Sequence, residues 1–377
     1  MSTRRLKVMF KEGYSYDIRV GNRLLVNLGI HMRDVTKATK AVVITDDNVG
    51  SLYLTKVRAA LLKAEFEVFD LTIPAGEESK NVVVAAELWD ALAHLGIGRD
   101  GVVVGLGGGV VGDIAAFVAS TYMRGIDCVQ VPTSLLAMVD SSIGGKTGIN
   151  LKGGKNLVGT FKQPIYVAAD LETLSTLPDG EWENGFAEIA KSALIDGTDF
   201  YQWLVDNTEG MRAHDETVIQ QAIVQSLTFK ARVVANDETE QGLRECLNYG
   251  HTFGHALEAA AGYGALSHGR AVAEGMRFAA RLAVEALEAP EQLANTQDTL
   301  LDKLGLNPVT KVFPADELYE RMFSDKKVRN SELRFVLLNR IGDWVTVVVD
   351  PDLVKIYLIL WEQARMKGEN PGKREEV

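Results

Sequence analysis

Residues 101–117 read GVVVGLGGGVVGDIAAF, and this stretch decides the fold. A β-branched apolar run at 101–104 precedes a G-x-G-x-x-G pattern formed by Gly107, Gly109 and Gly112, and an apolar segment follows. A strand that leads through glycines into a helix leaves backbone N–H groups at the helix start, where they bind anions. The stretch therefore predicts a strand, a phosphate-binding turn and a helix.

The position of this pattern leaves a second interpretation open. A dinucleotide-binding fingerprint normally follows the first strand of its unit, with an acid about 20 residues further on. Here the glycines follow about three predicted strands, and Asp127 comes too early. A glycine-rich turn that serves only the packing of helix on strand stays an alternative for these residues.

The chain changes texture near residue 178. Before it, β-branched runs at 40–44, 65–71 and 101–105 alternate with helical patterns at 52–64 and 81–95. Such alternation is typical of a parallel sheet flanked by helices. After the turn at 177–180, segments rich in Ala, Leu and Glu predict helices at 183–195, 217–236, 251–262 and 269–287.

Two domains follow from this pattern, since 377 residues exceed what one core usually organises. We expect an α/β domain with a Rossmann-like parallel sheet over 1–178 and a mainly α-helical domain over 179–377. The active site is predicted in the cleft between them.

Composition narrows the possible partners. A net charge of −11 argues against nucleic acid, whose phosphates are bound by basic surfaces. The N-terminus lacks an apolar signal region, and the apolar stretch 101–119 is interrupted by Asp113 and glycines, so no membrane span is predicted. Two cysteines, Cys128 and Cys246, are too few for a disulfide framework and are expected to be buried thiols. We therefore expect a cytoplasmic protein.

Residues 133–156 combine lysines with glycines and small polar residues. Lys146 and Lys155 lie in glycine-rich segments beside Ser, Thr and Asn. Ammonium and N–H donors aimed at one point from such loops bind phosphate or carboxylate groups. Solvated surface lysines are the alternative, but the group as a whole predicts an anion site.

Three of the six histidines lie within residues 251–268. His251 and His255 are four residues apart and share one face of a helix, which is half of a metal site. A third ligand must come from elsewhere, and Glu188, one turn before Lys191, is the candidate. No H-E-x-x-H motif occurs, which disfavours a zinc protease. An ordinary pair of helical histidines stays an alternative.

Seven motifs in sequence order resemble the 3-dehydroquinate synthase family. They are GGGVVGD, TYMRG, VPTSLLAMVDSSIGGKTGIN, GKN, NGFAEIAK, LNYGHTFGHALEA and DKKVR. The resemblance covers nearly the whole chain. It implies a lyase of the shikimate pathway, on the route to chorismate and the aromatic amino acids. The implied reaction converts 3-deoxy-D-arabino-heptulosonate 7-phosphate to 3-dehydroquinate and phosphate.

The resemblance also implies the cofactors and the course of the reaction. Tightly held NAD and one divalent metal ion, Zn²⁺ or Co²⁺, serve a transient oxidation, elimination of phosphate, reduction by the same NADH, and intramolecular aldol closure. NAD is regenerated in each turnover. A homodimer is implied because Arg124 matches an arginine that reaches the neighbouring subunit's site.

The same resemblance assigns the site residues. NAD-binding residues are Asp46, Asn48, Glu77, Lys80, Gly108, Gly109, Val110, Val111, Gly112, Asp113, Thr133, Ser134, Lys146, Lys155, Thr173, Leu174, Ser175 and Thr176. Metal ligands are Glu188, His251 and His268, which leaves His255 free of the metal. Substrate and catalytic residues are Arg124, Asp140, Lys146, Lys155, Asn156, Lys191, Lys230, Arg244, Asn248, His255 and one of Lys326 and Lys327.

Three positions depart from the family pattern. Arg270 stands where Glu is common, which we expect to alter the surroundings of the metal. Ser134 replaces Thr and keeps the hydroxyl, and Lys152–Gly153 stands where a loop that contains proline is common.

Two alternative functions stay open: a related cyclase acting on another sugar phosphate, and a metal-dependent polyol dehydrogenase, which would release NADH. A catalytically inactive binding module is disfavoured because the candidate residues are all present.

Overall fold

The computed structural model describes residues 2–11, 13–262, 264–323 and 332–368. The chain divides into two compact units. Unit 1 is Met1–Glu181 with Ile223–Thr239, and unit 2 is Trp182–Ala222 with Glu240–Val377. The segment Ile223–Thr239, which holds most of helix α8 (Glu216–Asn236), thus belongs to unit 1 although it follows the predicted boundary.

Unit 1 is built on a seven-stranded sheet with the order β1-β2-β9-β6-β5-β3-β4. Its strands are β1 (Arg4–Met9), β2 (Ser15–Gly21), β3 (Lys40–Asp46), β4 (Glu67–Ile73), β5 (Gly101–Gly107), β6 (Asp127–Pro132) and β9 (Tyr166–Asp170). β1 is antiparallel to β2, and every other pair in the sheet is parallel. The predicted α/β sheet is confirmed, with an antiparallel edge strand that the pattern did not predict.

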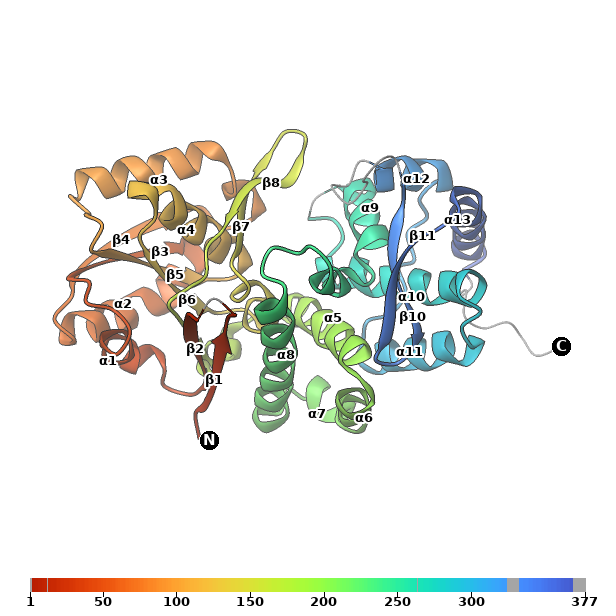
Figure 1. Cartoon of the computed structure of the whole chain (residues 1–377), viewed down its shortest axis with the longest axis horizontal. Helices are drawn as coiled ribbons and strands as arrows, with labels where there is room; N and C mark the ends of the chain where they lie inside the picture. The colour runs from red at the N-terminus through yellow and green to blue at the C-terminus, as the bar shows by residue number, and fades with distance from the viewer. Residues whose placement is uncertain (1, 12, 263, 324–331, 369–377) are drawn as a thin grey trace. The chain divides into compact units, whose positions relative to one another are not determined.

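Helices cover both faces of this sheet (Figure 1). Alternate side chains of β3 point to opposite faces. Val43 joins a core with helices α1 (Leu28–Arg33) and α2 (Asp47–Lys63). Val42 joins a second core with α3 (Val82–His94) and α4 (Gly109–Thr121). Burial on both faces explains why the central strands are apolar throughout.

Short helical turns connect these elements. The 3-10 turns of unit 1 are η1 (Leu25–Asn27), η2 (Glu77–Ser79), η3 (Tyr122–Arg124) and η5 (Leu171–Thr176), and η4 (Ala137–Ser141) is a π-helical turn. Several of the predicted site residues lie in them.

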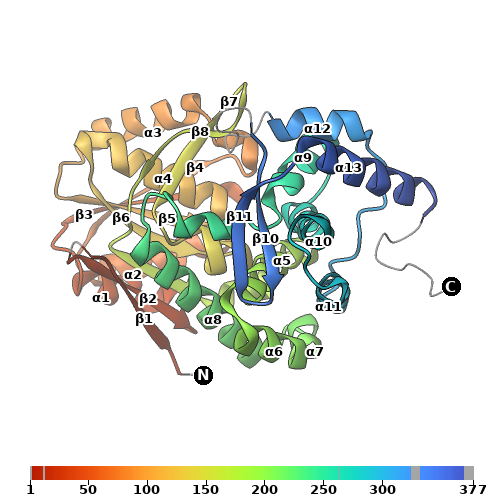
Figure 2. The ribbon, with the colours of Figure 1, turned by 45° about the vertical axis from the view of Figure 1, so that its right-hand side comes forward.

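Residues 146–161, which include Lys146 and Lys155, form a β-hairpin instead of the predicted loops (Figure 2). Strand β7 (Lys146–Leu151) pairs antiparallel with β8 (Gly154–Phe161). Its glycines and polar residues lack an alternating pattern, so pairing between the two strands and packing on α4 produce the hairpin. Ile149 anchors it by joining the core beneath α4.

Unit 2 is mainly helical, as predicted. Its helices are α5 (Asp179–Asp196), α6 (Thr198–Asp206), α7 (Thr208–Arg212), α9 (His251–Ala261), α10 (His268–Ala286), α11 (Glu291–Lys303), α12 (Ala315–Phe323) and α13 (Pro351–Met366), with the first residues of α5 in unit 1. The 3-10 turn η6 (Leu243–Asn248) and the antiparallel pair β10 (Arg334–Arg340) and β11 (Asp343–Val348) complete it. None of the described helices is long and apolar enough to cross a membrane.

Candidate active site and metal centre

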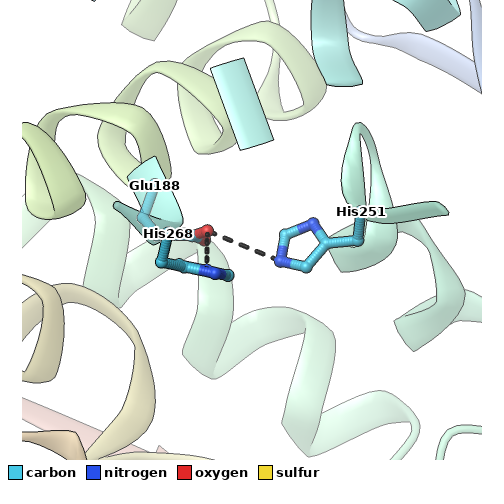
Figure 3. A group of neighbouring side chains, drawn as sticks. All are labelled: Glu188, His251 and His268. Atoms are coloured by element: carbon cyan, nitrogen blue, oxygen red, sulfur yellow. Dashed lines mark ion pairs between the residues drawn. The ribbon is translucent and has the colours of Figure 1, made fainter. Parts of the chain in front are cut away.

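Glu188, His251 and His268 lie together in unit 2 (Figure 3). One ligand atom from each residue lies within 4.8 Å of the other two. The Nε2 atoms of His251 and His268 are each 3.5 Å from Oε1 of Glu188. The structure thus groups the three residues that the resemblance assigns to the metal. Spacing alone suggests His251 and His255 as the pair of histidine ligands.

Three helices present these side chains. Glu188 lies in the middle of α5, where its side chain is 2% exposed. His251 is the first residue of α9 and follows Gly250, whose φ of 77° suits glycine. His268 is the first residue of α10, and Ser267 caps that helix by accepting a hydrogen bond from the Arg270 N–H at 3.3 Å.

Both histidines are oriented by acceptors at Nδ1. Nδ1 of His251 lies 3.1 Å from the Tyr249 carbonyl oxygen, and Nδ1 of His268 lies 3.2 Å from Oε2 of Glu258. Such acceptors fix the ring so that Nε2 faces a metal ion. Two imidazoles and one carboxylate form a common catalytic zinc site, which leaves a position for substrate or water. The residues therefore fit a divalent cation.

The electrostatics of the cluster favour a cation. Burial opposes a positive charge on His268, but hydrogen bonds to Glu188 and Glu258 outweigh it and raise the pKa of His268 to about 10. A bound divalent cation would supply this positive charge in place of the proton. The second carboxylate oxygen of Glu188, Oε2, accepts a hydrogen bond from the Lys191 ammonium, and both side chains are buried.

The first turn of α10 is held against α5. The Gly269 N–H donates to Oδ1 of Asn184 at 2.7 Å, and a Cβ at Gly269 would lie 2.4 Å from the Glu183 carbonyl oxygen. Arg270 forms a two-point ion pair with Glu183, with N···O distances of 2.8 and 3.0 Å. Arg270 thus forms a partly exposed ion pair between α10 and α5.

In unit 1 the predicted NAD residues follow the carboxyl ends of parallel strands. Asp46 ends β3, Glu77 and Lys80 follow β4, Gly108–Asp113 follow β5, Thr133 and Ser134 follow β6, and Thr173–Thr176 follow β9. β4 lies on one side of β3 and β5 on the other, so the order reverses at β3. Ligands of open α/β sheets bind beside the carboxyl ends at such a reversal.

The glycines of the opening motif divide between two roles. Gly112 serves packing, because a Cβ there would lie 2.9 Å from Oε1 of Gln130. A Cβ at Gly108 would lie 3.4 Å from Oγ of Ser134, and Gly108 is the residue before α4, whose N-terminus has no side-chain cap. The uncapped N–H groups fit a phosphate, so phosphate binding at this turn stays a prediction, whereas Gly112 serves packing.

Polar side chains near this turn form a small network. The Lys80 ammonium lies 2.5 Å from Oδ2 of Asp113. Burial raises the pKa of Asp113, and Lys80 opposes the shift. Asp46 accepts from the Val49 N–H at 2.8 Å, which is the capping bond of α2. Asp46 therefore has a structural role irrespective of any ligand.

The predicted substrate residues are distributed over both units. In unit 1, Lys230 of α8 donates to the backbone oxygen and to Oδ1 of Asp140, at 2.6 and 2.7 Å. In unit 2, Arg244 is 1% exposed in η6, and Asn248 donates to Oε1 of Glu240 at 3.0 Å. His255 stays one turn from His251, with ring centroids 5.3 Å apart. Lys326 and Lys327 lie outside the described residues.

The sequence did not predict a role in the site for two residues of these networks, Glu258 and Asn150. Glu258 meets His268 only because α9 and α10 pack together, which no local spacing reveals. Asn150 bonds to both Glu77 and Asn156 within unit 1. Its place at the end of the GGKTGIN motif was the available signal.

A cavity of about 640 Å³ in unit 1 lies elsewhere. Its walls include Lys7, Tyr16, Lys162, Gln163 and Glu238, and none of the predicted site residues lines it.

The Cys128 thiol is predicted to be inert in the folded protein. It is fully buried on β6, and burial raises its pKa from 9.0 to about 12. Because the thiolate is the nucleophile, alkylation by iodoacetamide at mildly alkaline pH should be negligible until the chain unfolds. Mass spectrometry of native and urea-unfolded samples checks this, and labelling of Cys128 at equal rates in both would contradict it.

Two protein-family models and two known proteins match most of this chain. The family models described as 3-dehydroquinate synthase N-terminal and C-terminal match residues 70–184 and 185–328. A 3-dehydroquinate synthase of Geobacter metallireducens is 44% identical over 333 residues, which cover 88% of this chain and 92% of that protein. One of Rhodopirellula baltica is 45% identical over 309 residues, 82% of each chain.

Solved structures of related cyclases have the same fold. A 2-deoxy-scyllo-inosose synthase complexed with carbaglucose-6-phosphate, NAD⁺ and Co²⁺ aligns with a TM-score of 0.83 at 27% identity, over 94% of this chain and 99% of that one. A 2-epi-5-epi-valiolone synthase of Streptomyces hygroscopicus subsp. jinggangensis, with NAD⁺ and Zn²⁺ bound, aligns with a TM-score of 0.83 at 27% identity, over 94% and 98%.

Proposed function

The chain belongs to the 3-dehydroquinate synthase family, and we propose that it converts 3-deoxy-D-arabino-heptulosonate 7-phosphate to 3-dehydroquinate and inorganic phosphate. The observation that carries the proposal is the cluster of Glu188, His251 and His268, with Lys191 bound to the same carboxylate. This cluster combines a cation site with a buried ammonium group. The predicted cleft between the two domains stays a prediction.

Two cofactors complete the proposal. Zn²⁺ or Co²⁺ would be held by Glu188, His251 and His268, and NAD by the residues at the carboxyl ends of the unit 1 strands. When bound, the metal supplies Lewis acidity toward a substrate oxygen, and NAD supplies a reversible hydride acceptor. The two structural relatives, one with NAD⁺ and Co²⁺ and the other with NAD⁺ and Zn²⁺ bound, support this choice of cofactors.

The chain's own basic and amide side chains would hold a substrate that carries both a phosphate and a carboxylate group, despite the net charge of −11. Candidates for the phosphate and carboxylate groups are Lys146, Lys155, Asn156, Arg244, Asn248 and one lysine of 326–327. Charge-assisted hydrogen bonds from such groups fix orientation and stabilise negative charge that develops during elimination. Lys230 and Asp140 belong to the same predicted set, and the Lys230 ammonium donates to the backbone oxygen and Oδ1 of Asp140 within η4.

His255 is proposed to relay protons, because it lies one turn from His251 and outside the cluster of ligands. Replacing it by alanine should lower kcat about 100-fold, the usual size of a general acid–base contribution. Metal content, measured by mass spectrometry of the digested protein, should stay at the wild-type level. Near-normal turnover with intact metal would rule this role out.

Arg124 is proposed to act in the site of the second copy of a homodimer. Met123 and Arg124 have φ values of 51° and 66°, and such strained positions cluster at functional sites. Arg124→Ala and Glu188→Gln should each be inactive alone. Mixed and refolded together, they should regain activity, because a mixed dimer holds one site with both residues intact. Monomeric protein, or no recovery on mixing, would contradict the assignment.

A comparison of substrates tests the proposed reaction against its alternatives. Phosphate release should be fast with 3-deoxy-D-arabino-heptulosonate 7-phosphate and negligible with glucose 6-phosphate, the natural counterpart of the analogue in the structural relative. Release from the second compound only would indicate a different cyclase. NADH accumulation with glycerol would indicate a polyol dehydrogenase. We also propose a cytoplasmic location, which the two buried cysteine thiols fit.

A further inference from the structure

Asn150 lies where the β7–β8 hairpin is irregular. The register of the two strands shifts between Ile149 and Leu151, so Asn150 has no regular partner in the ladder. Irregularities of this kind often redirect a side chain next to a functional site. Here the amide of Asn150 turns to two other segments of unit 1.

Three polar groups of Asn150 form hydrogen bonds to these segments. Its backbone N–H donates to the Lys80 carbonyl oxygen at 2.6 Å, and Nδ2 donates to Oε1 of Glu77 at 2.7 Å. Its Oδ1 accepts from the Asn156 N–H at 2.8 Å. One side chain therefore links the segment around η2 to strand β8.

The two linked segments differ in the ligands that their residues are predicted to bind. Glu77 and Lys80 are predicted to contact NAD, and Lys80 also pairs with Asp113 at the start of α4. Asn156 is predicted to contact the substrate, and its neighbour Lys155 is predicted to contact both the substrate and NAD. Asn156 has a φ of 53°, and a bond to its N–H helps to hold this uncommon conformation.

We propose that Asn150 is a positioning residue. Through it, the conformational order of the hairpin around Lys155 and Asn156 depends on whether NAD is bound at the segment Glu77–Lys80. This inference rests on the proposed function, since it uses the predicted NAD and substrate residues. Coupling of this kind is reciprocal: whatever NAD adds to phosphate binding, phosphate adds to NAD binding.

Hydrogen exchange measures the coupling without relying on activity. In the wild-type protein, addition of NAD should slow exchange in peptides that cover 152–158. In Asn150→Ala this slowing should be lost, while peptides of α4 remain protected by NAD. Asn27→Ala is the matched control, because Asn27 is exposed in unit 1 and its Nδ2 donates to the Arg23 carbonyl oxygen. It should behave as wild type.

Affinities give a second measurement with inorganic phosphate as the probe. Saturating phosphate should tighten NAD binding about fivefold in the wild type, at the lower end of usual couplings, and not at all in Asn150→Ala. Asn150→Asp keeps the acceptor for Asn156 but sets a carboxylate against Glu77, so it should also lose the coupling and provides a second variant should the alanine variant unfold.

The outcomes are distinct. Wild-type coupling in both Asn150 variants, or no coupling in the wild type, would overturn the role of Asn150 and leave the proposed function intact. Failure of the folded wild-type protein to bind NAD at all would overturn both.

Discussion

Glu188→Gln is expected to remove the metal and nearly all activity. The variant keeps the shape of the side chain but replaces the anionic ligand that lies 3.5 Å from both histidine Nε2 atoms. It also takes away the carboxylate that the buried Lys191 ammonium contacts. Because loss of an orienting group beyond the ligands already costs 10- to 100-fold, we expect loss of a ligand to cost roughly a thousandfold in phosphate release.

Metal content after dialysis and the rate of phosphate release measure this effect. Glu183→Gln is the matched control on the same helix: Glu183 pairs with the half-exposed Arg270, and such ion pairs contribute little. It should retain one metal ion per chain and near-normal rates. A Glu188→Gln enzyme with a full complement of metal and a rate within tenfold of wild type would refute the assignment.

Gly275→Ala is expected to have the largest effect on stability. A Cβ at Gly275 on α10 would lie 1.8 Å from the Gly250 carbonyl oxygen and 2.9 Å from the Gly254 backbone nitrogen. Helices α9 and α10 must then separate, at a cost of about 3 kcal/mol in the free energy of unfolding, the upper range of overpacking. Since these helices begin with His251 and His268, metal affinity should fall as well.

Urea unfolding followed by circular dichroism checks this expectation. Gly180→Ala is the control within a helix, because a Cβ there meets nothing within 4 Å. It should leave the unfolding midpoint unchanged or raise it slightly, since alanine is the better helix former. Equal midpoints for Gly275→Ala and the wild type would mean that α9 and α10 pack less tightly than described.

Much of the fold was predictable because burial leaves a pattern in the sequence. Strands β3 and β5 are buried on both faces and read as apolar runs, and α8 and α10 were predicted to within a residue or two at each end. The β7–β8 hairpin was not predicted, since its glycines and polar residues resemble a loop and most of β8 is exposed. The antiparallel edge pair β1–β2 was likewise missed.

The candidate site was predictable by motif and not by spacing. Spacing alone paired His251 with His255, whereas folding brings His268 and Glu188 to His251 from two other helices. The residues that orient the site, Glu258 and Asn184, acquire their roles only when α10 packs on α9 and α5. Contacts between helices distant in sequence leave no periodic signal, so these roles required the structure.

The most direct measurement is the number of phosphate ions released for each NAD present. Purified protein with one equivalent of NAD and excess 3-deoxy-D-arabino-heptulosonate 7-phosphate should release many phosphate ions per NAD without accumulating NADH. A chelator should stop the release, and Zn²⁺ or Co²⁺ should restore it. No phosphate from folded protein loaded with metal and NAD, or one NADH accumulated per turnover, would contradict the account.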